Sequence, residues 1–476
     1  MTWLDDAPLA QAWAVALDAG GTSMTIPGHK RNGRSLAPLL SRLVDGDVPL
    51  YGGLDEVKLT RGVLADAERR GAALWDADWC RYSTGGSTHA NQVLTLGIGR
   101  PGDTVLVARN AHRSIISGLA LADLRPVWLP AQLDPRTGVP LGLDLGALRA
   151  ALHEHPSAAG LFCVEPGYLG ATSDLAAVVE RAHEHGVPVI VDQAWGAHFG
   201  THPAYPPSAL AAGADAMVLS AHKTLPAYSQ AAVVAARGPR LDQHRLERAF
   251  EAAHTTSPAG TILASIDASR ALLAHSEGRR RLGWLADRVA QLRADLGRAG
   301  ISSVCPEDLP PGRYDPAKLV LMLAEAGLDG LAIERGLLER GIPVEMADRD
   351  TVVPIVTLAD DEARVARLER ALVDVTATLP RRPRKVVAAA QWTHTPTVAA
   401  TPREAFFAPH RTVGRDDALD RVSAELVAPY PPGIPLVVPG ERLTASTLDA
   451  LEQARQSGAR IAYAADPSLT TFQVLA

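Results

Sequence analysis

The sequence predicts an α/β protein whose main domain contains a mostly parallel sheet covered by helices. Helix-like and strand-like segments alternate from about residue 70, which is the pattern of repeated β–α–β units. The strand-like segments are short and apolar throughout, as strands buried on both faces of a parallel sheet are. A chain of 476 residues is too long for one compact core, so two or three domains are expected.

The elements can be followed in order along the chain. Strands are expected at 104–108, 127–130, 160–165, 188–192 and 216–220, with helical patterns between them. A long helix is expected near 265–297, followed by strands in 317–324 and 352–359 around a helix at 329–341. The proline-rich, basic stretch after 378 predicts a solvated connector, and strand-like segments return at 459–466 and 472–476.

These elements divide the chain into five parts. They are an N-terminal arm (1–45), a large domain (46–270), a small α/β domain (271–378), a linker (379–402) and a C-terminal α+β domain (403–476).

Composition limits the classes of function. The net charge is −6 and the basic residues are dispersed, which argues against binding to nucleic acid or an anionic membrane. The N-terminus lacks a basic region before its apolar residues, and no apolar run could span a bilayer, so a cytoplasmic protein is expected. Three widely spaced cysteines form neither a disulfide framework nor a metal-binding pattern. The expected partners are small molecules and further copies of the chain.

Lys223 follows the predicted strand 216–220 in the segment SAHKTLPAYSQ. The carboxyl end of a parallel strand suits an amine that must become a nucleophile, because loops converge there and burial lowers the amine pKa. Ser220 and His222 beside it suit an anionic phosphate. A solvated lysine in a polar turn explains the segment equally well.

Two further strand ends and one loop carry similar residues. Asp192 ends the predicted strand 188–192, where it could hold a proton on a pyridine nitrogen or simply cap a helix. The loop YSTGGSTHAN (82–91) precedes a helical pattern and could hold a phosphate or cap that helix. His112 follows another strand end, where it could stack on a planar ring or be structural. The convergence of these clusters on one edge of the sheet favours a cofactor site.

Seven motifs together give the sequence a family resemblance. They are IPGHKRNG (26–33), GSTHAN (86–91), RNAHRS (109–114), VDQAWGAHFG (191–200), SAHKTLPAYSQ (220–230), TTSPAGTILASID (255–267) and AELVAPYPPGIPLVVPGE (424–441). This set resembles the Orn/Lys/Arg decarboxylase family, whose members are pyridoxal 5'-phosphate (PLP) enzymes of fold type I, the aspartate-aminotransferase fold. The resemblance spans about residues 25–475 and implies a PLP-binding large domain and a C-terminal decarboxylase domain.

The resemblance also implies roles for individual residues. Lys223 would form the Schiff base with PLP, Asp192 would bind the pyridinium nitrogen, and His112 and Ala194 would lie against the two faces of the ring. The phosphate would be bound by Gly86, Ser87, Thr88, Ser220 and His222, with Thr256 from a partner subunit. Trp195, Glu441 and His29 would belong to the substrate site, Glu441 being suited to a cationic side chain. Lys30 would lie near the site without an assigned role.

Several departures from the family pattern affect the substrate site rather than the cofactor site. Many members have Asp-Glu-Ala-His where this chain has Asp192, Gln193, Ala194 and Trp195, and the family's Pro-Thr-Tyr-Tyr-Gly is PGYLG (166–170) here. The length leaves no room for the N-terminal wing domain of larger members, so a short form is expected, as a homodimer at least.

The resemblance implies decarboxylation of arginine, lysine or ornithine to the amine of a polyamine pathway and carbon dioxide. A PLP-dependent aminotransferase or another lyase is the alternative, although an aminotransferase needs a carboxylate anchor for which only Arg349 is available. A regulatory protein built on a decayed enzyme is disfavoured, because Lys223, Asp192 and His112 are retained together with the hydroxyls of the glycine-rich loop.

Overall fold

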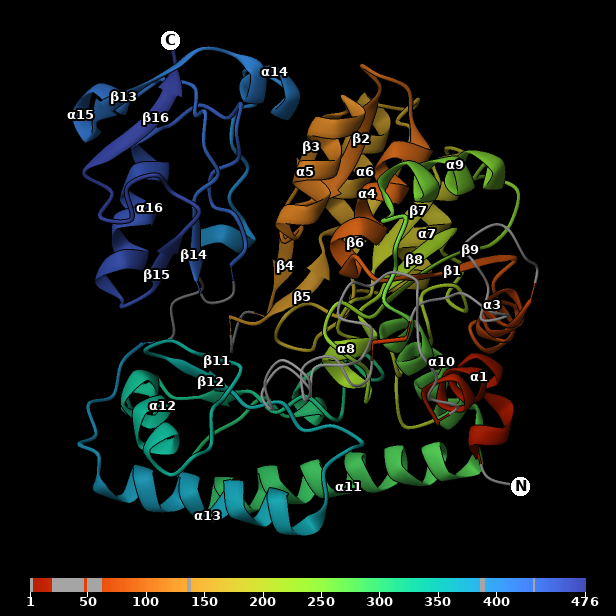
Figure 1. The fold of residues 1–476 in the computed structure, drawn as a ribbon. Helices are drawn as coiled ribbons and strands as arrows, with labels where there is room; N and C mark the ends of the chain where they lie inside the picture. Colours follow the sequence, from red (N-terminus) through yellow and green to blue (C-terminus); the bar gives the residue numbers. More distant parts are fainter. Residues whose placement is uncertain (1–2, 19–46, 49–61, 135–137, 386–389, 431–432) are drawn as a thin grey trace, which may run out of the picture.

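A seven-stranded sheet forms the centre of the large domain (Figure 1). The computed structural model describes residues 3–18, 47–48, 62–134, 138–385, 390–430 and 433–476. From edge to edge the strands are β1 (Trp79–Ser83), β9 (Ala232–Ala236), β8 (Ala216–Leu219), β7 (Val189–Asp192), β6 (Leu161–Val164), β2 (Thr104–Ala108) and β3 (Arg125–Leu129). Strand β9 is antiparallel to both neighbours, and the remaining pairs are parallel. The predicted α/β class with a mostly parallel sheet is confirmed.

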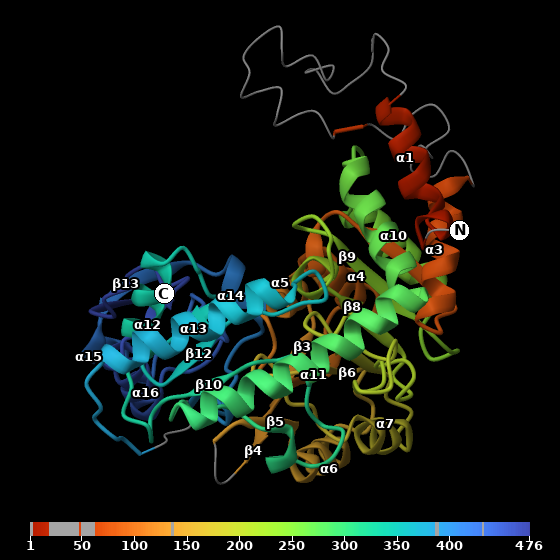
Figure 2. The ribbon, with the colours of Figure 1, turned by 90° about the horizontal axis from the view of Figure 1, so that it is seen from below.

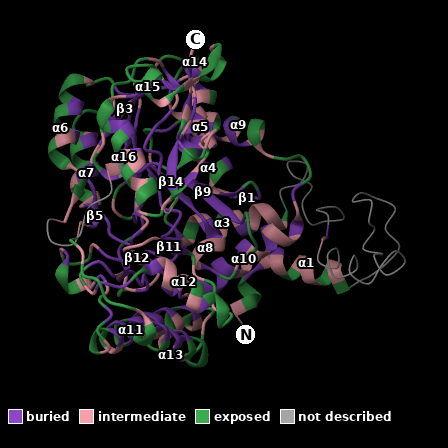
Figure 3. Cartoon of the chain, turned by 90° about the vertical axis from the view of Figure 1, so that its left-hand side faces the viewer, coloured by how far each residue is buried: buried purple, intermediate pink, exposed green. Residues whose placement is uncertain are grey.

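The five predicted strands all form, with ends within two residues of the predicted ones. Successive side chains point to opposite faces, so Val105 and Val107 pack into one apolar layer while Leu106 and Ala108 pack into the other. Helices cover both faces, and the buried sheet lies between them in Figure 3. The first layer contains α4 (Gly86–Ile98), α5 (Arg113–Ala122) and α9 (Gln243–Ala253), and the second contains α1 (Pro8–Asp18), α3 (Val63–Leu74), α6 (Leu145–Glu154), α7 (Leu175–His183) and α10 (Gly260–Ala274).

The single long helix predicted near 265–297 is wrong, because two helices form, α10 and α11 (Ser276–Arg298). His275 separates them in an extended conformation, and its side chain accepts a hydrogen bond from the Glu277 N–H at the start of α11. Helix α11 then runs beside α13 (Glu362–Thr378) across the lower part of the molecule (Figures 1 and 2). It thereby joins the large and small domains through one continuous apolar core.

The small domain is built on a short antiparallel sheet beside α12 (Gly330–Glu339). Its strands, in spatial order, are β10 (Leu321–Met322), β12 (Thr351–Val353) and β11 (Met346–Ala347). They are shorter than the predicted strand segments. The helix predicted at 329–341 is confirmed.

The C-terminal domain has its own apolar core, formed by residues between Ala418 and Val474. Its helices are α14 (Pro402–Phe407), α15 (Arg415–Ala418) and α16 (Ala445–Gln456), and its strand pairs are β13 (His410–Gly414) with β16 (Thr471–Leu475) and β14 (Ala428–Tyr430) with β15 (Arg460–Ala462). The smaller elements elsewhere are β4 (Ala131–Leu133), β5 (Pro140–Leu143), α8 (Ala221–Thr224) and the 3-10 helices at Trp3–Asp6, Pro306–Asp308 and Ala390–Trp392.

The segment predicted as a solvated connector is partly anchored. Arg384 forms an ion pair with Asp350 at 2.7 Å, and Trp392 is 4% exposed and packs with Ala131 and Ile434. The prediction of a solvated connector is therefore wrong for these residues. The apolar contact joins the linker to both the large and the C-terminal domains.

Two smaller predictions concern membranes and cysteines. Across the described ranges, no helix is both long enough and apolar enough to cross a membrane. Cys80, Cys163 and Cys305 are free.

Candidate active site

The carboxyl ends of the parallel strands bring the predicted cofactor residues to one edge of the sheet. Strand β7 ends at Asp192, and β8 is followed directly by α8, which carries Lys223. Strand β2 leads to His112, the N-cap residue of α5. The site therefore lies at the strand edge where ligands bind in open α/β sheets.

Asp192 is 3% exposed and is held by neutral donors. Its carboxylate accepts hydrogen bonds from Asn91 Nδ2 at 2.8 Å and from the Ala194 backbone N–H at 3.1 Å. Because these donors carry no charge, the carboxylate keeps its attraction for a protonated group brought by a ligand.

A chain of hydrogen bonds connects Asp192 to His112. Asn91 Nδ2 also donates to Ser114 Oγ at 2.9 Å, and Ser114 Oγ lies 2.8 Å from His112 Nδ1. His112 Nδ1 accepts from the Ser114 backbone N–H, so the proton of the neutral ring lies on Nε2. Burial lowers the pKa of His112, while the Asp192 charge acts in the opposite direction. The expected ring-stacking residue is thus a neutral, oriented imidazole.

Lys223 lies in an environment that lowers its pKa, since burial disfavours the ammonium form while Asp192 and Glu345 favour it. Its Nζ lies 4.3 Å from the centroid of the Trp195 ring. This is a partly desolvated amine beside a buried carboxylate, the environment in which a lysine becomes nucleophilic.

The residues predicted to bind phosphate meet at the start of α4. Ser87 Oγ and Ser220 Oγ are 2.5 Å apart, and Gly86 has a φ of +69°, which favours glycine. Thr88 lies in the first helical turn with Ser87, where backbone N–H groups lack partners inside the helix. His222 Nδ1 donates to the Ala231 carbonyl at 2.9 Å, which leaves Nε2 for a ligand.

These residues fit PLP. The buried carboxylate suits the ring nitrogen of that cofactor, and the desolvated lysine suits its aldehyde. The neutral imidazole suits the ring face, and the helix start with its paired hydroxyls suits the phosphate. Asn91 Oδ1 is buried without a hydrogen-bond partner in the described part of the chain, as a site awaiting a polar group would leave it. Ala194 is buried next to Asp192, consistent with a wall of the ring site.

Two members of the hydrogen-bond chain, Asn91 and Ser114, were missed as site residues. Both lie inside motifs that carry the family resemblance, GSTHAN and RNAHRS, so a signal was present in the sequence. Their function depends on α4 and α5 packing side by side, which places two residues 23 positions apart in contact.

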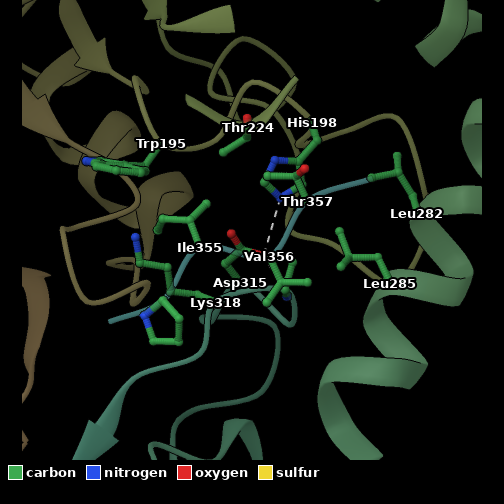
Figure 4. A pocket seen from close by; sticks show the side chains of 12 residues that line it. Trp195, His198, Thr224, Leu282, Leu285, Asp315, Lys318, Ile355, Val356 and Thr357 are labelled. Atoms are coloured by element: carbon green, nitrogen blue, oxygen red, sulfur yellow. Dashed lines mark hydrogen bonds and ion pairs between the residues drawn. The ribbon is translucent and has the colours of Figure 1, made fainter. Parts of the chain in front are cut away.

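A pocket next to Trp195 contains a second lysine that was also missed. Lys318 is 6% exposed and lines this pocket together with Trp195 (Figure 4). Its Nζ lies 3.9 Å from the Trp195 ring centroid and 5.2 Å from that of Tyr168. Burial lowers the pKa of Lys318 to about 8. Nothing in the sequence indicates this environment, because Lys318 belongs to an apolar segment whose pattern predicts a strand.

Glu441 forms a buried ion pair with Arg109. Its carboxylate accepts hydrogen bonds from Arg109 Nη1 at 2.5 Å, from Arg109 Nη2 at 3.2 Å and from the Val438 N–H at 2.8 Å. Both side chains of the ion pair are at most 3% exposed. The ion pair with Arg109 of the large domain favours a role in domain docking, and the assignment of Glu441 to a cationic substrate stays a prediction.

The structure describes two of the four remaining residues that were expected in or near the site, Trp195 and Thr256. Trp195 lies between Tyr168 and the two lysines, with its ring centroid 5.2 Å from that of Tyr168. Thr256 is exposed between α9 and α10, and its contribution to a second subunit stays a prediction. His29 and Lys30 lie outside the described residues.

Arg349, the anchor considered for an aminotransferase, forms an ion pair with Asp350 at 2.7 Å. It is therefore already engaged within the small domain.

Comparison of the sequence with known proteins finds relatives over almost the full length. The chain is 32% identical to the arginine decarboxylase of Halalkalibacterium halodurans and 30% identical to that of Bacillus subtilis, covering 94% of each chain in both comparisons. It is 23% identical to the inducible lysine decarboxylase of Escherichia coli, over 82% of this chain and 67% of that protein.

Solved structures share the fold. Lysine decarboxylase A from Pseudomonas aeruginosa superposes with a TM-score of 0.82 at 20% identity, covering 98% of this chain and 80% of that one. Serine palmitoyltransferase from Sphingomonas wittichii superposes less closely, with a TM-score of 0.55. The predicted PLP fold type I is confirmed. Residues 8–309 match the Orn/Lys/Arg decarboxylase major domain and residues 385–461 match the C-terminal domain, so the chain belongs to the Orn/Lys/Arg decarboxylase family.

Proposed function

We propose that this protein is a PLP-dependent decarboxylase that converts a basic amino acid, with arginine as the first candidate, into the corresponding amine and carbon dioxide. The observation that carries the proposal is the meeting of Lys223, Asp192 and His112 at one sheet edge beside the hydroxyls of Ser87 and Ser220. Arginine is preferred because the relatives of matching length are named arginine decarboxylases.

The chain's residues support this chemistry in separate ways. When bound, PLP supplies an electron sink for the electrons of the breaking bond between Cα and the carboxylate. Lys223 would hold the cofactor through its amine, and Asp192 would keep a proton at the ring nitrogen. His112, oriented through Ser114 and Asn91, would pack on the ring and exclude water from that face.

Phosphate binding would be shared by Gly86, Ser87, Thr88, Ser220 and His222. The neutral His222 ring has its proton on Nδ1, since Nδ1 donates to the Ala231 carbonyl. It would therefore donate from Nε2 only in the cationic form, which a neighbouring phosphate favours.

A partner subunit would contribute Thr256 to the phosphate site, so we propose that the protein forms at least a homodimer. We also propose that it acts in the cytoplasm, in a polyamine pathway.

The direct test measures carbon dioxide release from carboxyl-labelled arginine, lysine and ornithine and a set of non-basic amino acids. We expect release from at least one basic amino acid and loss of that activity in Lys223→Ala. Lys385→Ala is a matched control, because Lys385 is exposed outside the site. Transfer of the amino group to pyruvate without carbon dioxide release would instead identify an aminotransferase.

A further inference from the structure

The pocket beside Trp195 has a composition that the cofactor residues do not explain. Its wall is mostly apolar, with Leu282, Leu285 and Ile355 among the lining residues (Figure 4). Three other lining side chains carry buried polar atoms without hydrogen-bond partners in the described part of the chain, namely Lys318 Nζ, Thr224 Oγ1 and His198 Nδ1. A buried polar atom without a partner is costly, so these atoms indicate that a polar ligand binds here.

Lys318 is held in place by its surroundings. Its backbone carbonyl accepts hydrogen bonds from Arg293 Nη2 at 2.7 Å and from the Tyr314 hydroxyl at 3.1 Å. Its aliphatic stem passes close to Gly170, where an added Cβ would come within 2.7 Å of Lys318 Cγ. The backbone and the start of the side chain are therefore held in place before any ligand binds, which lowers the entropic cost of ordering Lys318 on binding.

Two carboxylates, Asp315 and Glu345, act on this ammonium group, and both have hydrogen-bond partners of their own. Lys318 Nζ and Lys223 Nζ lie 3.9 and 4.3 Å from the centroid of the same Trp195 ring. Asp315 is already engaged, because it lies 3.2 Å from His198 Nε2 and accepts from the Ala317 N–H. Once Lys223 holds PLP through its amine, the Lys318 ammonium group beside Trp195 still repels the cationic end of a basic amino acid and attracts its carboxylate.

The size of the cavity excludes a bulky ligand group. The cavity volume is about 20 Å³. On this measure a water molecule needs roughly 10–15 Å³, so the space is too small for a side chain of several carbons.

We infer that Lys318 binds the α-carboxylate of the substrate. This inference rests on the proposed function and deepens it, because it fixes which end of a basic amino acid faces the small domain. It also separates substrate from product: the amine formed by decarboxylation has lost the group that Lys318 attracts and is repelled by the same charge. Lys318 is thus a specificity residue for amino acids over amines.

The test compares two ligands that differ in this one group. L-arginine and agmatine share a side chain, but only L-arginine has a carboxylate. Binding of each to the PLP-loaded protein is followed by the change in cofactor absorbance on rapid mixing, before L-arginine is consumed, for wild type, Lys318→Met, Lys318→Gln and the exposed-lysine control Lys385→Met. The same variants are titrated with PLP and examined by thermal unfolding. Two neutral replacements are used so that one folded variant suffices.

We expect the neutral variants to bind L-arginine roughly 10- to 100-fold more weakly, the range for a charge-assisted hydrogen bond. Agmatine should bind as well as to wild type or better, PLP affinity should be unchanged, and Lys385→Met should match wild type throughout. Equal weakening of both ligands, unchanged binding of L-arginine, or a parallel loss of PLP affinity would overturn the assignment.

The two proposals fail separately. Absence of carbon dioxide release from every basic amino acid refutes the decarboxylase, whereas the absorbance titrations still compare an amino acid with its amine. L-lysine with cadaverine and L-ornithine with putrescine extend the comparison in the same way.

Discussion

Asp192 and Glu441 are two carboxylates with almost equal burial and opposite surroundings. They are 3% and 2% exposed. Asp192 is held by an amide and a backbone N–H, whereas Glu441 is held by the guanidinium of Arg109. A buried carboxylate with neutral donors keeps its charge available for a ligand, while one paired with arginine contributes to domain docking. Burial alone therefore does not identify a functional acid; its partners do.

Removing the charge of Glu441 should have the largest effect and act on stability. Glu441→Gln leaves Arg109 buried without its counter-ion, at an expected cost of about 3–5 kcal/mol. The measurement is the shift of the thermal unfolding midpoint. Activity at a low temperature should stay near wild type.

A double variant controls for packing in this comparison. Arg109→Met combined with Glu441→Gln should recover much of the lost stability, because no unpaired charge remains. Equal destabilisation by the double variant would show that side-chain packing, and not charge, holds the two domains together here.

Asp192→Asn should give the opposite result, a loss of activity with little change in stability. The expected fall in kcat/KM is about 100- to 1,000-fold, the size found when a preorganised electrostatic group is removed. Asparagine preserves the size of the side chain, so the unfolding midpoint should move less than in Glu441→Gln. A fall in stability as large as that of Glu441→Gln, with activity retained, would make Asp192 a structural residue.

The difference between Asp192 and Glu441 also shows which site residues can be predicted from the sequence. Asp192, Lys223 and His112 were found because each follows a strand of a parallel sheet, a position set by local pattern. The ion pair of Glu441 could not be predicted, because its partner Arg109 lies 332 residues away and the contact depends on how the C-terminal domain docks. Lys318 was missed because hydrophobic pattern describes its neighbours and not the environment of its Nζ. Strand β9 is buried and apolar throughout, like β8, which pairs in parallel with β7, so composition does not reveal that β9 is antiparallel.

The hydrogen-bond chain behind Asp192 should contribute less than Asp192 itself. Ser114→Ala removes the hydroxyl between Asn91 and His112 but keeps the backbone N–H that also bonds His112 Nδ1. We expect kcat/KM to fall roughly 3- to 10-fold, as for one ordinary hydrogen bond. Ser117→Ala, one turn along α5, is the matched control because Ser117 bonds Gln92 and the Ser114 carbonyl instead. Equal effects of the two variants would remove the chain from the mechanism.

The last expected effect is a pH dependence that Lys318 adds to KM. Burial and the Lys223 charge lower its pKa to about 8, against the opposing effects of Asp315 and Glu345. The ammonium form therefore predominates below pH 8 and is lost above it, so KM for the amino acid should be flat below that pH and rise above it. The rise should approach about tenfold per pH unit, because each unit removes about nine tenths of the remaining charged form.

Lys318→Met provides the reference, since titration of the substrate amine and of Lys223 affects both proteins. Steady-state KM for the amino acid is measured from pH 6.5 to about 9.5 in wild type and variant, and the ratio of the two values is plotted. That ratio should be constant at low pH and approach one at high pH, where neither protein has a charge at this position. If the ratio of the two KM values does not change with pH, Lys318 acts on the substrate through packing alone. Lys318 would then be a structural group like Glu441, and not a charge available to a ligand like Asp192.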